Sequence, residues 1–469
     1  MGGGDATTFQ CIPSLCARLK DVEPSTYVEW EPHAESRAFR RIFVCPSACG
    51  KSFPFMRPHV GLDACHSKNQ KYPTFIMLVA CMDGNNTLIA FGMVDKENED
   101  NWNWFLNHLR RFVTGIQASH VQFVSDRCKG IINAIRNNFP GQSHVHCTIH
   151  LQRNVKKRFG VQMEKLFKVL HRCKSEEWYK QVLQTIKDQN QACWEYLEVI
   201  NPTVYVMFAI PHPRFGHTTS NIVEIANNCI LPIRGFGLLR LCIELYLYIM
   251  EKKAKQHQLA MDMADGELTP YARKHMTTEE FEAGMYRVRV ASLNEALVQS
   301  SREEFIVTLQ STASCTCLVY RDMLLPCSHI IAFDREIRMS NERHVAQMWL
   351  CNYFQRAHME TLRPIDTSHL LTSPSCMAPP PMLRRGRRHG RRIAGPGEVS
   401  NIRSRQVTSP AIMPLESLLS TAPTHRSGGR LCSICREPGH DRRTCGRQRV
   451  PERSADQSRE ISHPDDDRT

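Results

Sequence analysis

The sequence predicts an α/β protein in which helices cover a mixed sheet, followed by smaller modules and a long tail. Between residues 57 and 160, runs of strand-forming residues alternate with runs that carry large apolar residues at helical spacing. This order favours a sheet with helices packed on it. From residue 160 to about 210 the pattern is helical alone. Beyond about residue 367 the composition shifts to Pro, Arg and Ser, and too little apolar surface remains to build a core.

Two strand-forming runs at the start of this region predict a β-hairpin. Residues 74–80 and 88–94 are rich in β-branched and aromatic residues, and Gly84-Asn85-Asn86 between them is typical of a turn. Just before them, residues 60–62 form a short apolar approach to Asp63. The elements expected next are a helix at 101–113, a strand at 121–124 ending at Ser125-Asp126, a helix at 130–139, a strand at 144–147, a basic helix at 149–159, the helical insert at about 160–210, and a long helix at about 220–258.

Composition limits the class of protein. A chain of 469 residues has room for two or three domains, and its 60 Lys and Arg against 47 Asp and Glu give a net charge of +13. Such a surplus favours nucleic acid as a partner, although charge alone is equally consistent with an unspecialised basic protein. Residues 1–9 do not resemble a signal peptide, and no apolar run is long enough to span a bilayer. We therefore expect an intracellular protein without a membrane partner.

The 20 cysteines are expected to be reduced in that compartment, where clustered Cys and His more often bind metal than form disulfides. Cys45 and Cys49 have no second pair nearby. We interpret these two residues as ordinary thiols.

Two aspartates are placed where strands are expected to end. Asp63 and Asp126 each follow an apolar run, and catalytic groups gather at strand ends in α/β sheets. Carboxylates on neighbouring strand ends can share divalent cations, which activate a hydroxyl and stabilise the leaving oxygen during attack on phosphate. Taken alone, each residue is better interpreted as a turn aspartate.

Five further observations change that interpretation. In order along about 200 residues, they are residues 55–66 with Asp63, residues 94–105, residues 123–131 with Asp126, the Cys147-Thr148-Ile149-His150 pair, and residues 218–227 with Glu224. Together these segments resemble the Mutator-like element (MULE) transposases.

The resemblance implies an RNase H-like core at residues 56–260, with a helical insert between the second and third acids. It implies DNA strand cleavage and strand transfer by Asp63, Asp126 and Glu224 with Mg²⁺ or Mn²⁺, and DNA partners at the element ends and the target. Glu244 is the nearest rival for the third acid, but it lies among apolar residues without the Thr-Ser-Asn approach that precedes Glu224.

Residues near the second acid suggest accessory roles. Cys147 and His150 suit a metal or DNA contact, but two groups do not complete a zinc site, and a structural role is the favoured interpretation. His144 and His146 would complete a quartet, without further support. The basic residues that follow are candidates for DNA contacts: Lys156, Lys157 and Arg158.

A first cysteine and histidine module is expected at residues 285–360. Its spacing is C-x-C-x9-C-x-H, formed by Cys315, Cys317, Cys327 and His329. Three thiolates and an imidazole form a complete tetrahedral set for structural Zn²⁺. The pattern resembles the SWIM-type zinc finger that follows the core in many Mutator-like proteins, and the sequence leaves open whether it contacts DNA or protein.

A second module is expected at residues 431–446. Its C-x2-C-x4-H-x4-C spacing resembles a CCHC zinc knuckle, a second zinc site that commonly binds single-stranded nucleic acid. Disordered segments are expected on either side, at 367–430 and 447–469. The knuckle ligands are Cys432, Cys435, His440 and Cys445.

An arginine-rich run at residues 384–392 is expected between the two modules. It is interpretable as a solvated tail, a DNA-binding arm or a nuclear localisation signal. Localisation is favoured slightly, since a transposase of a eukaryotic element must enter the nucleus.

The leading hypothesis is therefore an active transposase, which is also expected to form homo-oligomers. The alternative is a domesticated or degenerate relative that regulates transcription by binding DNA. Three intact acids favour the enzyme, whereas a lead-in of only about 55 residues, without the usual DNA-binding zinc domain, favours the alternative. An RNA-binding knuckle protein with a passive core would make the acids a coincidence.

Overall fold

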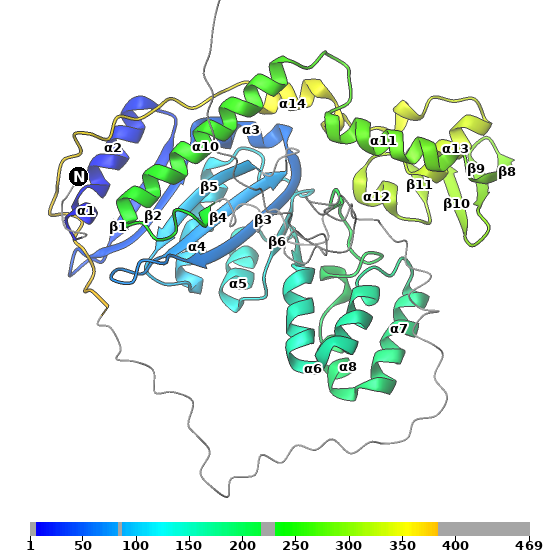
Figure 1. Cartoon of the computed structure of the whole chain (residues 1–469), viewed down its shortest axis with the longest axis horizontal. Helices are drawn as coiled ribbons and strands as arrows, with labels where there is room; N and C mark the ends of the chain where they lie inside the picture. Colours follow the sequence, from blue (N-terminus) through cyan, green and yellow to red (C-terminus); the bar gives the residue numbers. More distant parts are fainter. Residues whose placement is uncertain (1–5, 83–86, 217–229, 383–469) are drawn as a thin grey trace, which may run out of the picture. The chain divides into compact units, whose positions relative to one another are not determined.

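The computed structural model describes residues 6–82, 87–216 and 230–382, all within one compact unit (Figure 1). A seven-stranded mixed sheet forms its centre, in the order β1-β2-β5-β4-β3-β6-β7. The expectation of a mixed sheet covered by helices is confirmed. The strands are β1 Tyr27–Pro32, β2 Phe39–Cys45, β3 Arg57–His66, β4 Phe75–Met82, β5 Thr87–Val94, β6 Gln122–Ser125 and β7 Ser143–His146.

The central strands β3, β4 and β5 are antiparallel, and β6 and β7 are added in parallel. Every residue of β5 is buried. A strand covered on both faces requires a continuous apolar run rather than alternation, which explains the composition of residues 87–94. The two expected hairpin strands pair as predicted, with Val79 opposite Ala90, while the turn residues 84–86 lie outside the described residues.

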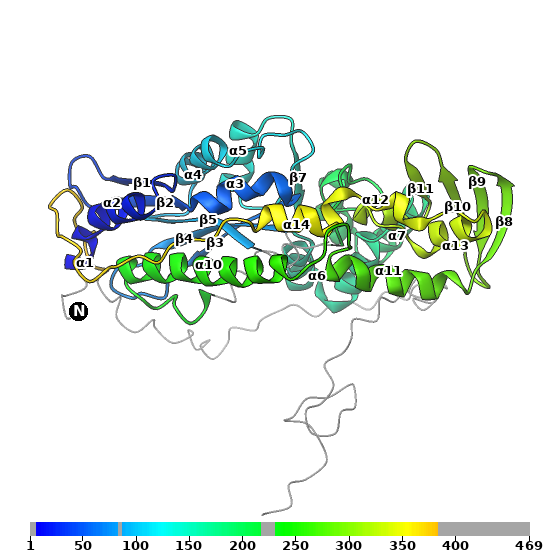
Figure 2. The ribbon, with the colours of Figure 1, turned by 90° about the horizontal axis from the view of Figure 1, so that it is seen from above.

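Helices cover both faces of this sheet. The helices α4 (Glu99–Phe112) and α5 (Lys129–Asn138) lie on one face, and α10 (Leu238–Met261) lies on the other (Figure 2). Helix α4 begins at Asn98, whose side chain accepts a hydrogen bond from the Asn101 backbone N–H. It buries Trp102, Phe105 and Leu109, as their helical spacing predicted.

The amino-terminal residues are part of the same sheet. Strand β2 pairs antiparallel with β5 and joins β1 to the sheet. Phe9 and Ile12 belong to the main core. The described residues of the expected lead-in, 6–55, therefore contribute to the central fold. The helices of this part are α1 Thr7–Gln10, α2 Ile12–Val22, α3 Ser47–Ser52 and the short η1 Phe53–Phe55.

The helical insert is observed where it was expected. Helix α6 (Thr148–Leu170) is interrupted at Gly160, whose φ of 89° and ψ of 178° are non-helical. Only glycine adopts this backbone conformation readily, so the basic helix ends where the sequence predicted, at Phe159. The remaining helices of the insert are α7 Glu176–Gln189, α8 Gln191–Glu198 and the short η2 Pro202–Val204.

The long helix expected at 220–258 is observed from Leu238 onward, but the expectation is wrong at residues 231–237. Helix α10 begins only at Leu238, and residues 231–237 form turns. Pro232 lacks a backbone N–H and its ring clashes with the preceding helical turn, so it cannot lie in a helix interior without disrupting it. Residues 217–229 lie outside the described residues.

The carboxyl-terminal described part holds a four-stranded antiparallel sheet with its own core. Val298, Val307, Ile330 and Phe333 are buried there, and the strand order is β11-β10-β9-β8. The elements are α11 Pro270–Ala283, β8 Arg287–Ser292, β9 Glu295–Gln299, β10 Glu304–Leu309, β11 Ala313–Cys315, α12 Val319–Met323, α13 Ser328–Glu336, η3 Asn341–His344, η4 Gln347–Trp349 and α14 Cys351–Ala357.

The segment after α14 differs from the expected disordered linker up to residue 382. The Phe39 backbone N–H donates to the Met377 carbonyl at 2.8 Å, and Cys376 is fully buried. Apolar residues within this Pro- and Ser-rich stretch therefore tie it to the amino-terminal strands. Among the helices that are described, none has both the length and the apolar character needed to cross a membrane.

The close packing of Gly92 in β5 predicts a large stability effect. A Cβ at this position would lie 2.7 Å from the Ile42 carbonyl oxygen and 2.9 Å from the Phe105 ring. Gly92→Ala is therefore expected to lower the free energy of unfolding by about 1–3 kcal/mol, the usual cost of overpacking. Urea denaturation measures this. Gly235→Ala, where a Cβ meets nothing within 4 Å, is the control, and an equal loss in both variants would contradict the packing argument.

Candidate active site

The pairing of β3 with β6 places Asp63 beside Asp126. The two strands are parallel, and the last paired residues are Gly61 and Val124. Two residues further along each chain lie Asp63 and Asp126, so the same register sets them opposite each other. Asp126 directly follows β6, as predicted.

Asp63 does not end its strand, which corrects the expectation from the sequence. Strand β3 continues to His66 because β4 still pairs with it there, and Asp63 lies opposite Leu78. The shorter partner β6 stops at Ser125. Asp63 is thus at the end of the β3–β6 ladder but inside the β3–β4 ladder, and it is held more firmly than a loop residue would be.

Both carboxylates are oriented by nearby backbone groups. The Ala64 N–H donates to Asp63 Oδ1 and the Cys128 N–H donates to Asp126 Oδ1, each at 3.0 Å. Both aspartates are half-buried. An arrangement of two fixed and accessible carboxylates suits a hard divalent cation such as Mg²⁺ or Mn²⁺.

His150 and Glu97 lie within electrostatic reach of this pair. The Cys147 thiol beside the ring raises the pKa of His150, and the charges of Asp63 and Asp126 raise it further against the effect of burial. Burial, followed by the charge of Asp126, raises the pKa of Glu97. Glu97 was not singled out from the sequence, because nothing local marks it among the other acidic residues that precede α4.

The quartet of Cys147, His150, His144 and His146 does not form a metal site. Within the described residues, the one group with three or more metal-binding side chains close together lies elsewhere. His144 Nε2 instead contacts Ser125 Oγ at 2.8 Å. Burial lowers the pKa of His144 to about 3, and burial followed by the charge of Arg127 lowers that of His146 to about 4, so both are neutral.

The third acid expected from the sequence, Glu224, lies outside the described residues. The chain resumes at Ile230, which is buried in the main core. Shortly afterwards, the Arg234 guanidinium donates to the His66 carbonyl at 2.9 and 2.6 Å, at the end of the strand that carries Asp63. The rival Glu244 lies in α10 and pairs with Arg240 at 3.4 Å.

The three basic candidates on α6 are all exposed, but they differ in their partners. Lys156 pairs with Glu164 at 3.1 Å, and the same carboxylate pairs with Lys168 at 3.2 Å. Arg158 instead lies over the Tyr196 ring, 4.9 Å from its centroid. Lys156 is therefore less available to a phosphate than Lys157 or Arg158.

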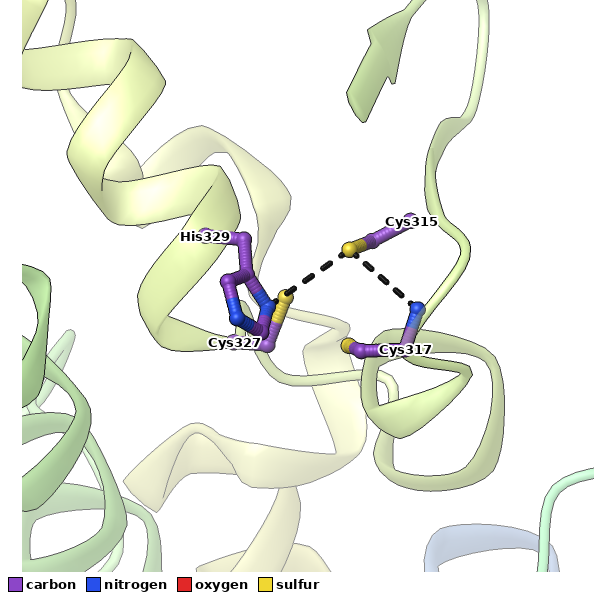
Figure 3. A group of neighbouring side chains, drawn as sticks. All are labelled: Cys315, Cys317, Cys327 and His329. Atoms are coloured by element: carbon purple, nitrogen blue, oxygen red, sulfur yellow. Dashed lines mark hydrogen bonds between the residues drawn. The ribbon is translucent and has the colours of Figure 1, made fainter. Parts of the chain in front are cut away.

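The first zinc-type cluster is assembled as its spacing predicted (Figure 3). The ligand atoms of Cys315, Cys317, Cys327 and His329 all lie within 4.8 Å of one another, and all four residues are buried. Hydrogen bonds from the Cys315 and Cys327 thiols hold the pKa of Cys317 well below its ordinary value. Three sulfurs and one ring nitrogen that converge in this way fit a tetrahedral structural metal.

Side chains around the cluster fix its histidine and its helix. The Phe305 ring lies 3.8 Å from the His329 ring, and the Tyr286 ring lies 4.7 Å from it. The Glu279 carboxylate accepts a hydrogen bond from the Ser328 N–H at 2.7 Å. These supporting residues carry no spacing signal in the sequence. The knuckle ligands Cys432, Cys435, His440 and Cys445, and the arginine run at 384–392, lie outside the described residues.

One segment of the chain, which includes both aspartates, is similar to known transposases. Residues 59–154 match the MULE transposase domain, and this segment contains Asp63, Asp126, Cys147 and His150. The chain is also similar to the transposases for insertion sequence element IS256 in transposon Tn4001 from Staphylococcus aureus and from Enterococcus faecalis. Each is 33% identical over 73 residues, which is 16% of this chain and 18% of the relative. The chain thus spans about a fifth of the length of these curated relatives.

Removal of one cluster thiol tests whether this group holds a metal. Cys327→Ser is expected to lower the zinc content by one ion per chain and to expose residues 285–360 to proteases, because the metal substitutes for core in a small module. Elemental analysis and limited proteolysis measure both effects. The control is Cys351→Ser, a buried thiol outside the cluster. Equal zinc content in the wild type and both variants would show that the cluster is not a zinc site.

Proposed function

We propose that this chain is a DNA transposase of the Mutator-like type, which cuts and joins DNA strands with divalent metal ions. The carrying observation is that β3 pairs in parallel with β6 up to Gly61 and Val124, two residues before Asp63 and Asp126, inside the segment that matches the MULE transposase domain. The order of the central strands, three antiparallel followed by two parallel, further supports an RNase H-like core.

In this proposal, Asp63, Asp126 and Glu224 hold Mg²⁺ or Mn²⁺. The bound ions would activate the attacking hydroxyl and stabilise the leaving oxygen at phosphorus. The protein's own contribution is placement, since the Ala64 and Cys128 N–H groups fix the two carboxylates. His150, whose protonated form is favoured beside the acids, would balance their negative charge.

The other modules have supporting roles in the proposal. Cys315, Cys317, Cys327 and His329 would bind a structural Zn²⁺, and Cys432, Cys435, His440 and Cys445 would bind a second one in a knuckle that contacts single-stranded nucleic acid. The DNA partners would be the element ends and the target. We further propose a nuclear location, through the arginine run at 384–392, and self-association of the chain.

Replacement of the second acid tests the catalytic assignment. Asp126→Asn keeps the shape of the side chain but weakens its hold on a cation. It is therefore expected to lower DNA cleavage and strand transfer by about 10²–10³-fold, the scale lost when one preorganised electrostatic group is removed. The assay uses the full chain, Mn²⁺ or Mg²⁺, and DNA carrying the ends of its own element.

Asp188→Asn is the matched control, because Asp188 is an exposed aspartate on α7 whose carboxylate accepts from Gln184. It is expected to retain wild-type cleavage. DNA binding by the wild type without any cleavage would sink the enzyme proposal and favour the DNA-binding regulator.

The third acid has a separate test. Glu224→Gln is expected to abolish cleavage with either metal, whereas Glu244→Gln should retain it, because Glu244 already pairs with Arg240 on the surface of α10. Single-turnover cleavage rates of the two variants decide between them. The reverse ranking would transfer the assignment to Glu244 and leave the Asp63 and Asp126 pair in place.

A further inference from the structure

Two arginines from different elements converge on one tyrosine of the helical insert. Arg127 Nη1 donates to the Tyr196 hydroxyl at 3.0 Å. From α6, the Arg158 guanidinium carbon lies 4.9 Å from the centroid of the same ring. Phe159 packs nearby, with its ring 5.7 Å from that of Tyr196. The phenol therefore bonds one guanidinium through its hydroxyl and stacks the other against its face.

Neither guanidinium of this group is neutralised by an ion pair. Within the described part of the chain, Arg127 and Arg158 form no ion pair with a carboxylate, and both contact Tyr196. The contrast lies on the same helix, where Glu164 neutralises both Lys156 and Lys168. Two guanidiniums at one neutral ring repel each other, and an anion shared between them would relieve that repulsion.

The position of the group points to its ligand. Arg127 directly follows Asp126, and the hydrogen bond from the Cys128 N–H to Asp126 Oδ1 fixes the backbone on either side of it. An anion held by Arg127 would therefore lie close to the proposed metal centre. Arginine forks bind phosphate oxygens through two parallel hydrogen bonds, and a DNA strand presents such oxygens at every nucleotide.

We infer that Arg127, Arg158 and Tyr196 form a binding site for a DNA phosphate next to the strand being cut, an inference that rests on the proposed function. The Tyr196 hydroxyl orients Arg127, and its ring supports Arg158. The helical insert thereby supplies one wall of the DNA path and does more than separate the second acid from the third. Arg158 becomes the basic residue of α6 with a defined role, and Lys156 does not share it.

A purely structural tie between insert and core is the simpler alternative. The Arg127–Tyr196 hydrogen bond alone would serve that purpose. A second guanidinium on the same ring adds charge repulsion without adding a link to the core, since Arg158 and Tyr196 both belong to the insert side. A structural contact between insert and core therefore does not explain the second arginine, Arg158, whereas a phosphate-binding site does.

Salt-dependent DNA binding tests the inference. Arg158 is exposed, so Arg158→Gln should fold normally. It is expected to weaken binding to a short mixed-sequence DNA duplex several-fold and to reduce the slope of log affinity against log salt by about 0.9, the value for one lost phosphate contact. Arg127→Gln should behave in the same way. Tyr196→Phe, which keeps the ring but releases Arg127, should show a smaller loss.

Lys187→Gln is the matched control, since Lys187 lies over the Trp194 ring at 4.1 Å in the same insert, away from Asp126 in sequence. It should keep the wild-type slope. Arg158→Lys should also keep the salt slope, because the positive charge remains. It should bind DNA more weakly than the wild type, because lysine lacks the planar guanidinium that donates two parallel hydrogen bonds. Anisotropy titrations over a range of KCl concentrations, with unfolding curves for each variant, provide these measurements.

The outcomes separate this inference from the proposed function. Cleavage by the wild type with unchanged slopes in both Gln variants would overturn the phosphate site and leave the transposase proposal intact. If the wild type binds DNA without cutting it and both Gln variants show reduced salt slopes, the phosphate site is supported and the proposed enzymatic activity is rejected. A wild type that neither binds nor cuts DNA would overturn both.

Discussion

The parallel pairing of β3 with β6 is the constraint on which the proposed chemistry depends. Hydrogen bonds between two strands fix their register to a single residue, and a shift by one would turn every side chain of a strand to the opposite face. The observed ladder ends at Gly61 and Val124, and continuing its register by two residues brings Asp63 and Asp126 opposite each other. The pairing with β4 extends past this point, so a buried sheet rather than a loop holds the first carboxylate.

The Cys/His module depends on a different source of order. Its core is small, and its four ligands lie near the ends of elements: Cys315 is the last residue of β11, Cys317 precedes α12, and Cys327 and His329 lie at the start of α13. A metal that joins these junctions would close loops that apolar contacts alone hold weakly. The stacking of Phe305 on His329 and the capture of the Ser328 N–H by Glu279 then fix the direction of one ligand. In the proposed zinc site, folding and metal binding would therefore be coupled, whereas the central sheet has a larger apolar core of its own.

Local patterns predicted what local physics determines. The apolar runs at 74–80 and 88–94, the glycine at residue 160 and the spacing of Cys315 to His329 each specify structure within a short segment. Pro232 is a local signal as well, and it lies in the turn that precedes α10. By contrast, the extension of β3 beyond Asp63 and the contact between Arg127 and Tyr196, 69 residues apart, depend on tertiary packing. No periodicity or motif spacing encodes such contacts.

The distribution of charge, rather than its total, connects the two halves of the proposed site. A net charge of +13 indicates a polyanionic partner but does not place it, and compensated residues such as Lys156 contribute to the total without offering a free charge. The proposed site combines two carboxylates, Asp63 and Asp126, with two guanidiniums, Arg127 and Arg158, which form no ion pair with a carboxylate among the described residues. Metal-assisted attack on a phosphodiester requires side chains of both charges. Negative carboxylates bind the cations, and positive hydrogen-bond donors hold the phosphate against those cations. In the proposed site, Arg127 beside Asp126 and Arg158 of α6 would supply the positive charge, and Tyr196 of the insert would hold both in place.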